Sequence, residues 1–247
     1  MAPLEARPDA PIARVHPLPK LVAATILAIA LFITVDIVTS AVVVAVLALA
    51  FPLTGLPLAG FARRAAPLAA AAAGIAFFNS VFGQHGATGG IAAALRITGI
   101  SLAGLIAVTT IDPTDLADAL VQHTRASPRF IVGALAASRL APLFGQEWEI
   151  LGLARRARGV GSERWIDRIR DMPGRTFALL VSAIRRATRL ALAMDARGFG
   201  QRACRTVARP RPISPADLAL PGAALLLASA ATALSVALGT WRPLVTF

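Results

Sequence analysis

A long stretch near the start of the chain is dominated by apolar residues that are interrupted at only a few polar positions. Residues 21–53 are almost wholly apolar, which is too long for one membrane span of about 20 residues and barely enough for two. Asp36, Thr39 and Ser40 interrupt this stretch. We therefore predict two short apolar helices separated by a polar turn. Asp36 has an alternative interpretation as a functional acid inside the membrane, where ionisable residues are costly and usually serve a function.

Three further segments are apolar enough to be membrane spans, at residues 68–82, 91–111 and 218–238. Residues 55–67 carry an arginine pair, and we expect a short basic loop there. Arg96 lies near one end of its predicted span, where its charge would reach the interface. Small side chains that would permit close helix packing lie at Gly99, Ser101, Ala103 and Gly104.

The composition supports a membrane protein. Hydrophobic residues make up 56% of the chain and charged residues only 15%, so the polar share is too small to cover a folded surface in water. We expect three parts, which are a tail with four transmembrane helices (1–111), a cytoplasmic helical module (112–211) and a last transmembrane helix (212–247). This arrangement predicts a multi-pass membrane protein with a cytoplasmic N-terminus.

The positive charge is concentrated in one block between apolar segments. Residues 123–211 hold 18 of the 25 basic and 6 of the 13 acidic residues, a local balance of 18 − 6 = +12 that equals the net charge of the chain. The positive-inside rule therefore places this block in the cytoplasm. Nucleic-acid binding is the alternative for such a charge, but no aromatic stacking platform accompanies it. We expect the lipid bilayer, and no nucleic acid, as a partner.

Helix-start signals divide the basic block. Residues 112–115 (Asp-Pro-Thr-Asp) combine an N-cap, a proline at the first helical position and an acid near the positive helix end, which predicts a helix of about ten residues. Ser127 and Pro128 repeat the signal, and the helix after them should run to Arg158 with a bend at Pro142.

Met172 and Pro173 predict the start of a second long helix. Its apolar residues recur at three- and four-residue spacing, as in an amphipathic helix. They are Phe177, Leu180, Val181, Ile184, Ala187, Ala191 and Met194. Arginines lie away from much of this stripe, so a helix resting on anionic lipid headgroups is one interpretation of the pattern.

Both long helices end in the pattern Ala-Arg-Gly-x-Gly, at residues 157–161 and 196–200. The glycine after each arginine suits the left-handed residue that closes many helices. Arg158 and Arg197 would then lie at helix C-termini, where a cation is favourable. The simplest interpretation is two well-capped helices. However, two tips that each present one forked, permanently charged donor would also suit docking into two similar acidic grooves.

With these motifs, the chain resembles the transmembrane T component of energy-coupling factor (ECF) transporters, a family that includes relatives serving biotin and cobalt uptake. The resemblance begins at residues 16–21 (HPLPKL), continues through 112–120, and is most specific at the two Ala-Arg-Gly signatures, above all at 193–199. It implies an all-α protein of the bacterial inner membrane with about five transmembrane helices and long cytoplasmic amphipathic coupling helices, which would form the module at residues 112–211.

The resemblance also implies partners and a role. The chain would be a non-catalytic scaffold, without a cofactor of its own, that joins two ABC-type ATPase subunits to a membrane S component for uptake of a vitamin or transition-metal ion. The implied ATPase-docking residues are Ala157, Arg158, Gly159, Ala196, Arg197 and Gly198. The implied contacts with the S component are Phe177, Val181 and Ile184.

Two departures from the family pattern bear on these roles. Asp195 stands where the family often has glutamate, which is a mild change. Arg155 and Arg156 make the first tip unusually basic, so the sequence leaves open which arginine is the principal contact there. We favour Arg158 because it directly precedes the glycine.

Other chemistry finds little support in the sequence. There is no Gly-x-x-x-x-Gly-Lys-[Ser/Thr] loop for nucleotide phosphates. Asp115 and Asp118 have the spacing of a carboxylate pair in a prenyltransferase-like membrane enzyme, but no second acidic cluster accompanies them. The three histidines and Cys204 form no pattern typical of a metal site. A membrane enzyme, and a solitary secondary transporter that uses Asp36, are the alternatives to a coupling scaffold.

Overall fold

The fold is all-α. A computed structural model of the protein describes residues 12, 15–83, 86–124, 126–159, 165–199, 209–210 and 212–241. Helices make up most of these residues, and no β-strand occurs among them. The chain divides into two compact units, one formed by Met1–Ala119 with Arg211–Phe247 and the other by Leu120–Pro210. The all-α membrane fold expected from the sequence is therefore confirmed.

The long apolar stretch forms two helices, as predicted. Helix α2 covers Pro17–Ile33 and α3 covers Ile37–Ala50, followed by the 3₁₀ turn η1 at Phe51–Thr54. Asp36 is the N-cap of α3, and one carboxylate oxygen accepts a hydrogen bond of 2.7 Å from the backbone N–H of Thr39. The turn lies where the polar residues predicted it, because a buried helix start needs an acceptor for its free N–H groups.

The predicted basic loop at residues 55–67 is wrong. Helix α4 covers Leu58–Phe82, so the arginine pair lies within its first turns and Pro67 lies inside the helix. The loop before α4 is reduced to a few residues, with Gly55 in the left-handed conformation at φ 66°. A proline in a helix removes one backbone hydrogen bond, and the remaining bonds of this 25-residue helix are enough to carry it through that position.

Helix α5 covers Gly86–Thr110, and it starts earlier than the apolar pattern suggested. Arg96 is therefore well inside the helix and not near its end. Its guanidinium donates to the carbonyl of Phe32 in the last turn of α2, at 2.5 Å, and lies 5.1 Å from the Phe32 ring. The charge is thus satisfied by a helix C-terminus of the same unit, which is a favourable place for a cation.

The last helices of this unit complete a set of membrane spans. The 3₁₀ turn η2 (Pro215–Leu218) leads into α9 (Ala219–Ala237). Within the part of the chain that the structure describes, four segments are long and apolar enough to cross a membrane, and these are Ile37–Thr54, Leu58–Phe82, Gly86–Thr110 and Pro215–Ala237. Helix α2 is apolar but shorter, with 17 residues.

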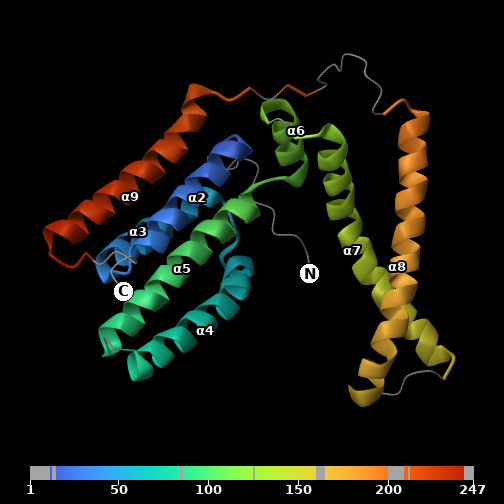
Figure 1. Ribbon diagram of the computed structural model, residues 1–247, viewed down its shortest axis with the longest axis horizontal. Helices are drawn as coiled ribbons and strands as arrows, with labels where there is room; N and C mark the ends of the chain where they lie inside the picture. The colour runs from blue at the N-terminus through green and yellow to red at the C-terminus, as the bar shows by residue number, and fades with distance from the viewer. Residues whose placement is uncertain are drawn as a thin grey trace. The chain divides into compact units, whose positions relative to one another are not determined.

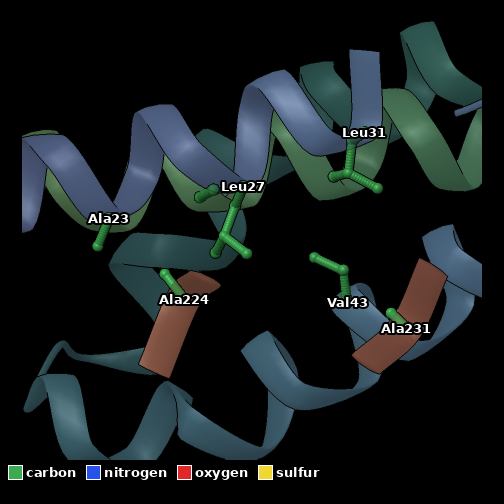
Figure 2. Close-up of a cluster of buried hydrophobic side chains, with 7 residues drawn as sticks. Ala23, Leu27, Leu31, Val43, Ala224 and Ala231 are labelled. Carbon is green, nitrogen blue, oxygen red and sulfur yellow. The ribbon is translucent and has the colours of Figure 1, made fainter. Parts of the chain in front are cut away.

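Small side chains hold the spans together. Helix α5 contacts α4, α2 and α3, and α9 contacts α2 and α3 (Figure 1). The core is built from alanine, leucine and valine, as Figure 2 shows. Its members are Ala23, Leu27, Leu31, Val43, Ala103, Ala224 and Ala231. Because lipid is as apolar as leucine, close contact between small residues is the main source of attraction between such helices.

Of the small residues predicted to pack, Gly99 and Ala103 are buried, and together with Ala107 they form a four-residue repeat along α5. A Cβ on Gly99 would lie 2.8 Å from a methyl of Leu31 and 3.3 Å from one of Val44. Gly104 faces open space, with nothing within 4 Å of where its Cβ would be. The prediction therefore holds for Gly99 and Ala103 and is wrong for Gly104.

Two polar contacts, which together form a small network, join the start of α2 to the end of α5 and to the turn η2. The ammonium group of Lys20 in α2 is buried and donates to the carbonyl of Thr110, the last residue of α5, at 3.0 Å. The backbone N–H of His16 donates to the carboxylate of Asp217 in η2, also at 3.0 Å. This network ties α2 to both α5 and the segment that precedes α9.

Candidate functional site

The candidate site lies in the unit formed by Leu120–Pro210. A short helix, α6 (Pro113–His123), ends inside this unit, and its start is capped by Asp112 as predicted, with 2.6 Å from the carboxylate to the Thr114 N–H. Two long helices follow. They are α7 (Pro128–Ala157) and α8 (Trp165–Ala196).

Helix α7 begins at Pro128 as predicted, but α8 begins earlier than expected. The predicted start at Met172-Pro173 is wrong, because α8 already runs from Trp165 and Pro173 lies inside it. Proline is tolerated in the first turn of a helix and weakens later positions, so the sequence signal placed the start about two turns late. Helix α8 is 32 residues long, which corresponds to about 48 Å.

Helices α7 and α8 run antiparallel and cross (Figure 1). Their contacts join the second half of α7 to the first and middle parts of α8: Glu147 contacts Ser182, and Arg155 contacts Asp171. The sum of the paired residue numbers stays nearly constant along the contact, as an antiparallel pair requires. The start of α7 and the end of α8 extend beyond this contact.

The first Ala-Arg-Gly signature forms the end of α7. Ala157 is the last helical residue and Arg158 is the C-cap. Gly159 has φ 75°, and its N–H donates to the carbonyl of Arg156 at 2.9 Å. This is the left-handed closing residue that the sequence predicted.

The second signature closes α8 in the same way. Gly198 has φ 73° and donates to the carbonyl of Asp195 at 2.9 Å, while the N–H of Phe199 donates to the carbonyl of Met194, also at 2.9 Å. The two bonds together form a Schellman motif. Arg197 is the residue between the helix and the left-handed glycine, so both signature arginines occupy the same position at their helix ends.

Both signature arginines are exposed, and they lie far apart. Among the described residues, no ion pair or hydrogen bond involves the guanidinium of Arg158 or Arg197. Arg158 precedes the start of α8 by a few residues and Arg197 follows its end, so the two are separated by roughly the length of α8, on the order of 45 Å. The unit therefore presents two similar cationic tips at opposite ends.

The neighbouring arginines of the first tip differ in their contacts. Nε of Arg155 lies 2.7 Å from Oδ1 of Asp171, whose side chain is only 3% exposed. Arg156 is exposed, as Arg158 is. Arg155 is thus occupied within the unit, which leaves Arg156 and Arg158 open to solvent.

The apolar face of α8 is exposed along much of its length. Phe177 is 68%, Val181 39% and Ile184 57% exposed. The face also extends toward the start of the helix through residues that precede the predicted start. They are Trp165, Ile166 and Ile169, and together with Met172 they are all more than half exposed. Their three-residue spacing in the sequence is the signal that could have identified them.

Two other residues that the sequence offered as candidates lie at helix starts. Asp36 caps α3, and Asp115 lies in the first turn of α6. In the part of the chain that the structure describes, no three His, Cys, Asp or Glu side chains are grouped so that they could hold a metal ion. His85 and Cys204 lie outside the described residues.

The fold and the site define a multi-pass α-helical membrane protein with two long, largely exposed helices, of which α8 is amphipathic. A comparison with protein families matches residues 10–207 to CbiQ, the cobalt transport protein family. The match covers most of the 247 residues, and the chain belongs to this family. It is therefore a membrane transport component, as the resemblance found in the sequence indicated. A search among curated individual proteins finds no match.

Proposed function

We propose that this chain is the T component of an ECF-type ABC importer of the bacterial inner membrane. It would link two cytoplasmic ATPases to a substrate-binding S component. The observation that carries the proposal is the pair of exposed arginines, Arg158 and Arg197, each followed by a left-handed glycine at a helix end of a cobalt transport family member.

The geometry of the tips favours two separate partners. The left-handed glycine ends each helix abruptly, so the arginine before it projects from the tip. A guanidinium offers a rigid fork of donors to carboxylates. Because the tips are on the order of 45 Å apart, one partner molecule at each tip is the simplest arrangement. Two copies of one ATPase, each with the same acidic groove, would meet this requirement. Ala157, Gly159, Ala196 and Gly198 would shape the tips.

The exposed face of α8 would support the S component. An amphipathic helix that leaves Phe177, Val181 and Ile184 in contact with solvent needs a cover. A membrane subunit that rests on this face would provide it, and movement of the ATPases would then reach that subunit through α7 and α8.

The substrate would be a transition-metal ion or a vitamin, with cobalt as the first to test because the family is described as cobalt transport. In the ECF family, which the chain resembles, another subunit determines specificity. The basic block at residues 123–211 supports a cytoplasmic location for the coupling helices and a cytoplasmic N-terminus.

The test is co-purification from detergent of this chain with the ATPases of its own genome that are candidates for ECF subunits. We expect the wild type to retain two ATPase subunits. Arg158→Ala and Arg197→Ala should each reduce retention, and the double variant should abolish it, since a hydrogen bond to a charged group contributes about 1.5–3 kcal/mol. Arg185→Ala, an exposed arginine away from both tips, is the control with the same charge change and should behave like the wild type.

The apolar face is tested separately. Val181→Glu together with Ile184→Glu should release the S component and leave ATPase retention intact. Arg189→Glu makes the same change of two charges at an exposed position on another face of the helix, and it is the control. If the wild type retains no ATPase, the coupling role is wrong. Asp36 and the Asp115–Asp118 pair would then be tested for a solitary transporter or a membrane enzyme.

A further inference from the structure

Charged side chains form ion pairs where α7 and α8 cross. Among the described residues of α8, Asp171 is the one that is fully buried, and its neighbours on the helix are largely exposed. The centre of a helix crossing is normally apolar, because burial of a carboxylate is costly unless cations and hydrogen bonds compensate it. A carboxylate at this position therefore requires a specific explanation.

Two arginines from different helices compensate Asp171. Arg155 of α7 lies 2.7 Å from Oδ1, and Arg175, one turn further along α8, donates from Nε to Oδ2. Arg175 is also 5.9 Å from the ring of Trp148 on α7. One buried acid thus holds a cation from each helix, and one of these cations also contacts the opposite helix.

A second polar cluster lies further along the same crossing. Glu147 of α7 accepts hydrogen bonds of 2.8 Å from the hydroxyl of Ser182 and the guanidinium of Arg186, both on α8. Arg186 also lies 6.0 Å from the ring of Phe144. On α7 the two clusters are separated by the eight residues from Glu147 to Arg155, which is about 12 Å.

Glycines make room for the first cluster on both helices. A Cβ on Gly152 of α7 would lie 2.5 Å from Nη1 of Arg175, and a Cβ on Gly174 of α8 would overlap the guanidinium of Arg155. An arginine side chain can usually move away from such a contact, but these two are held by Asp171. The glycines and the ion pairs are therefore parts of one arrangement.

We propose that the Asp171 and Glu147 clusters lock the register and the crossing angle of α7 and α8, so that the two helices turn as one rigid cross. One contact point would stop the helices from sliding but would let them rotate about it like scissors. Two contact points about 12 Å apart resist both movements. Asp171 is thus a positioning residue that fixes Arg158 relative to Arg197. The importance of this lock for transport rests on the coupling role proposed above.

The test measures the distance between the arms beyond the crossing. Ala137 and Ala193 are exposed residues on α7 and α8 outside the contact, and they would carry spin labels as Ala137→Cys and Ala193→Cys in the full-length chain with Cys204→Ser. We expect one narrow distance distribution for the chain in detergent. Asp171→Asn should broaden it by roughly twofold, because loss of the buried charge leaves two arginines without their shared counter-ion.

A charge exchange and a matched control sharpen the test. Arg155→Asp combined with Asp171→Arg restores one acid between two bases and should recover much of the narrow distribution. Asp195→Asn, which removes an exposed acid at the far end of α8, should leave it unchanged. An Asp171→Asn distribution identical to that of the wild type would overturn the lock.

The complex with ATPases distinguishes the lock from the coupling role. A rigid cross predicts the same distance between the labels with and without ATP in the wild type, and a nucleotide-dependent change only in Asp171→Asn. A nucleotide-dependent change in the wild type would show scissoring and overturn the proposal. If the wild type retains no ATPase, the coupling role fails while the measurement in detergent still decides whether the lock exists.

Discussion

Arg155 and Asp171 face each other across the crossing of α7 and α8, with 2.7 Å between Nε and Oδ1. This contact separates the arginines of the first Ala-Arg-Gly tip into two kinds. Arg155 forms an ion pair that joins α7 to α8, whereas Arg156 and Arg158 are exposed. The sequence alone could not make this distinction, because the acid lies 16 residues away on another helix. The choice of Arg158 as the docking residue stays a prediction, and Arg155 now has a different role.

The glycines at the crossing give a first prediction. Gly152→Ala and Gly174→Ala should each weaken the Asp171 cluster by about 1–3 kcal/mol, since the added methyl displaces a guanidinium from its acceptor. Hydrogen exchange of the amides at residues 144–155 would then become faster. Gly145→Ala is the matched control, because nothing lies within 4 Å of its Cβ position. Alanine is favoured over glycine in helices by about 1 kcal/mol, so exchange in that variant should slow. Slower exchange in all three variants would contradict the prediction.

A second prediction concerns the cap of α8. Gly198 has φ 73°, a conformation that costs a residue with a Cβ about 1–2 kcal/mol. Gly198→Ala should therefore fray the last turn and weaken ATPase retention together with it. Gly198→Asn should be milder, because asparagine tolerates the left-handed region better. The readouts are hydrogen exchange at residues 190–197 and co-purification. Gly133→Ala, in an open position of α7, controls for the added methyl and should change neither.

A third prediction concerns the packing of the membrane spans. Gly99→Val should destabilise the protein by about 1–3 kcal/mol, because Leu31 is fully buried and its methyl has no space to move away. Gly104→Val makes the same change one turn further along α5, where nothing lies within 4 Å. The midpoint of thermal unfolding in detergent should fall for the first variant and stay near the wild type for the second. Equal midpoints would show that Gly99 is not a packing site.

These examples show what the sequence could predict and where it could not. Apolar length and local start and stop signals are chemical properties of a few adjacent residues, and they located the turn at Asp36, the start of α7 at Pro128 and both left-handed glycines. The signals misled where a proline lay inside a helix. Pro67 and Pro173 are interior residues of α4 and α8, because the surrounding helix is long enough to tolerate a missing hydrogen bond.

Contacts between distant residues had no signal in a single sequence. The pairing of Glu147 with Ser182 and Arg186 depends on how α7 crosses α8, and that crossing is not encoded in the spacing along either helix. The same holds for Arg96, whose partner is a backbone carbonyl of Phe32. Every residue has a backbone carbonyl, so the residue type at position 32 does not indicate that this carbonyl accepts a hydrogen bond from Arg96. The contact could be found only in the structure.

The buried ammonium of Lys20 gives a fourth prediction. It donates to the last carbonyl of α5, that of Thr110, at 3.0 Å, and so compensates a helix end that would otherwise lack a donor. Lys20→Met preserves the apolar stem and removes the charge, and we expect a loss of about 1–3 kcal/mol in stability. Thr25→Val removes an exposed hydroxyl from the same helix and is the control. A lower unfolding midpoint for Lys20→Met alone is the expected result, and equal midpoints for both variants would contradict the capping role.

The last prediction distinguishes a structural from a functional Asp36. One carboxylate oxygen accepts from the N–H of Thr39 at 2.7 Å, and the other is buried without a hydrogen-bond partner among the described residues. Asparagine retains the one acceptor that the N-cap needs, so Asp36→Asn should keep near wild-type stability. Asp36→Ala should cost about 1 kcal/mol. If the residue only caps α3, uptake of cobalt, the first substrate to test under the proposed function, should survive Asp36→Asn in cells that express the proposed importer. If Asp36 is instead an acid that must bind a proton or cation during transport, Asp36→Asn would abolish uptake while the unfolding midpoint stays unchanged. The combination of uptake and unfolding midpoint in the two variants therefore decides between a helix cap and a transport site inside the membrane.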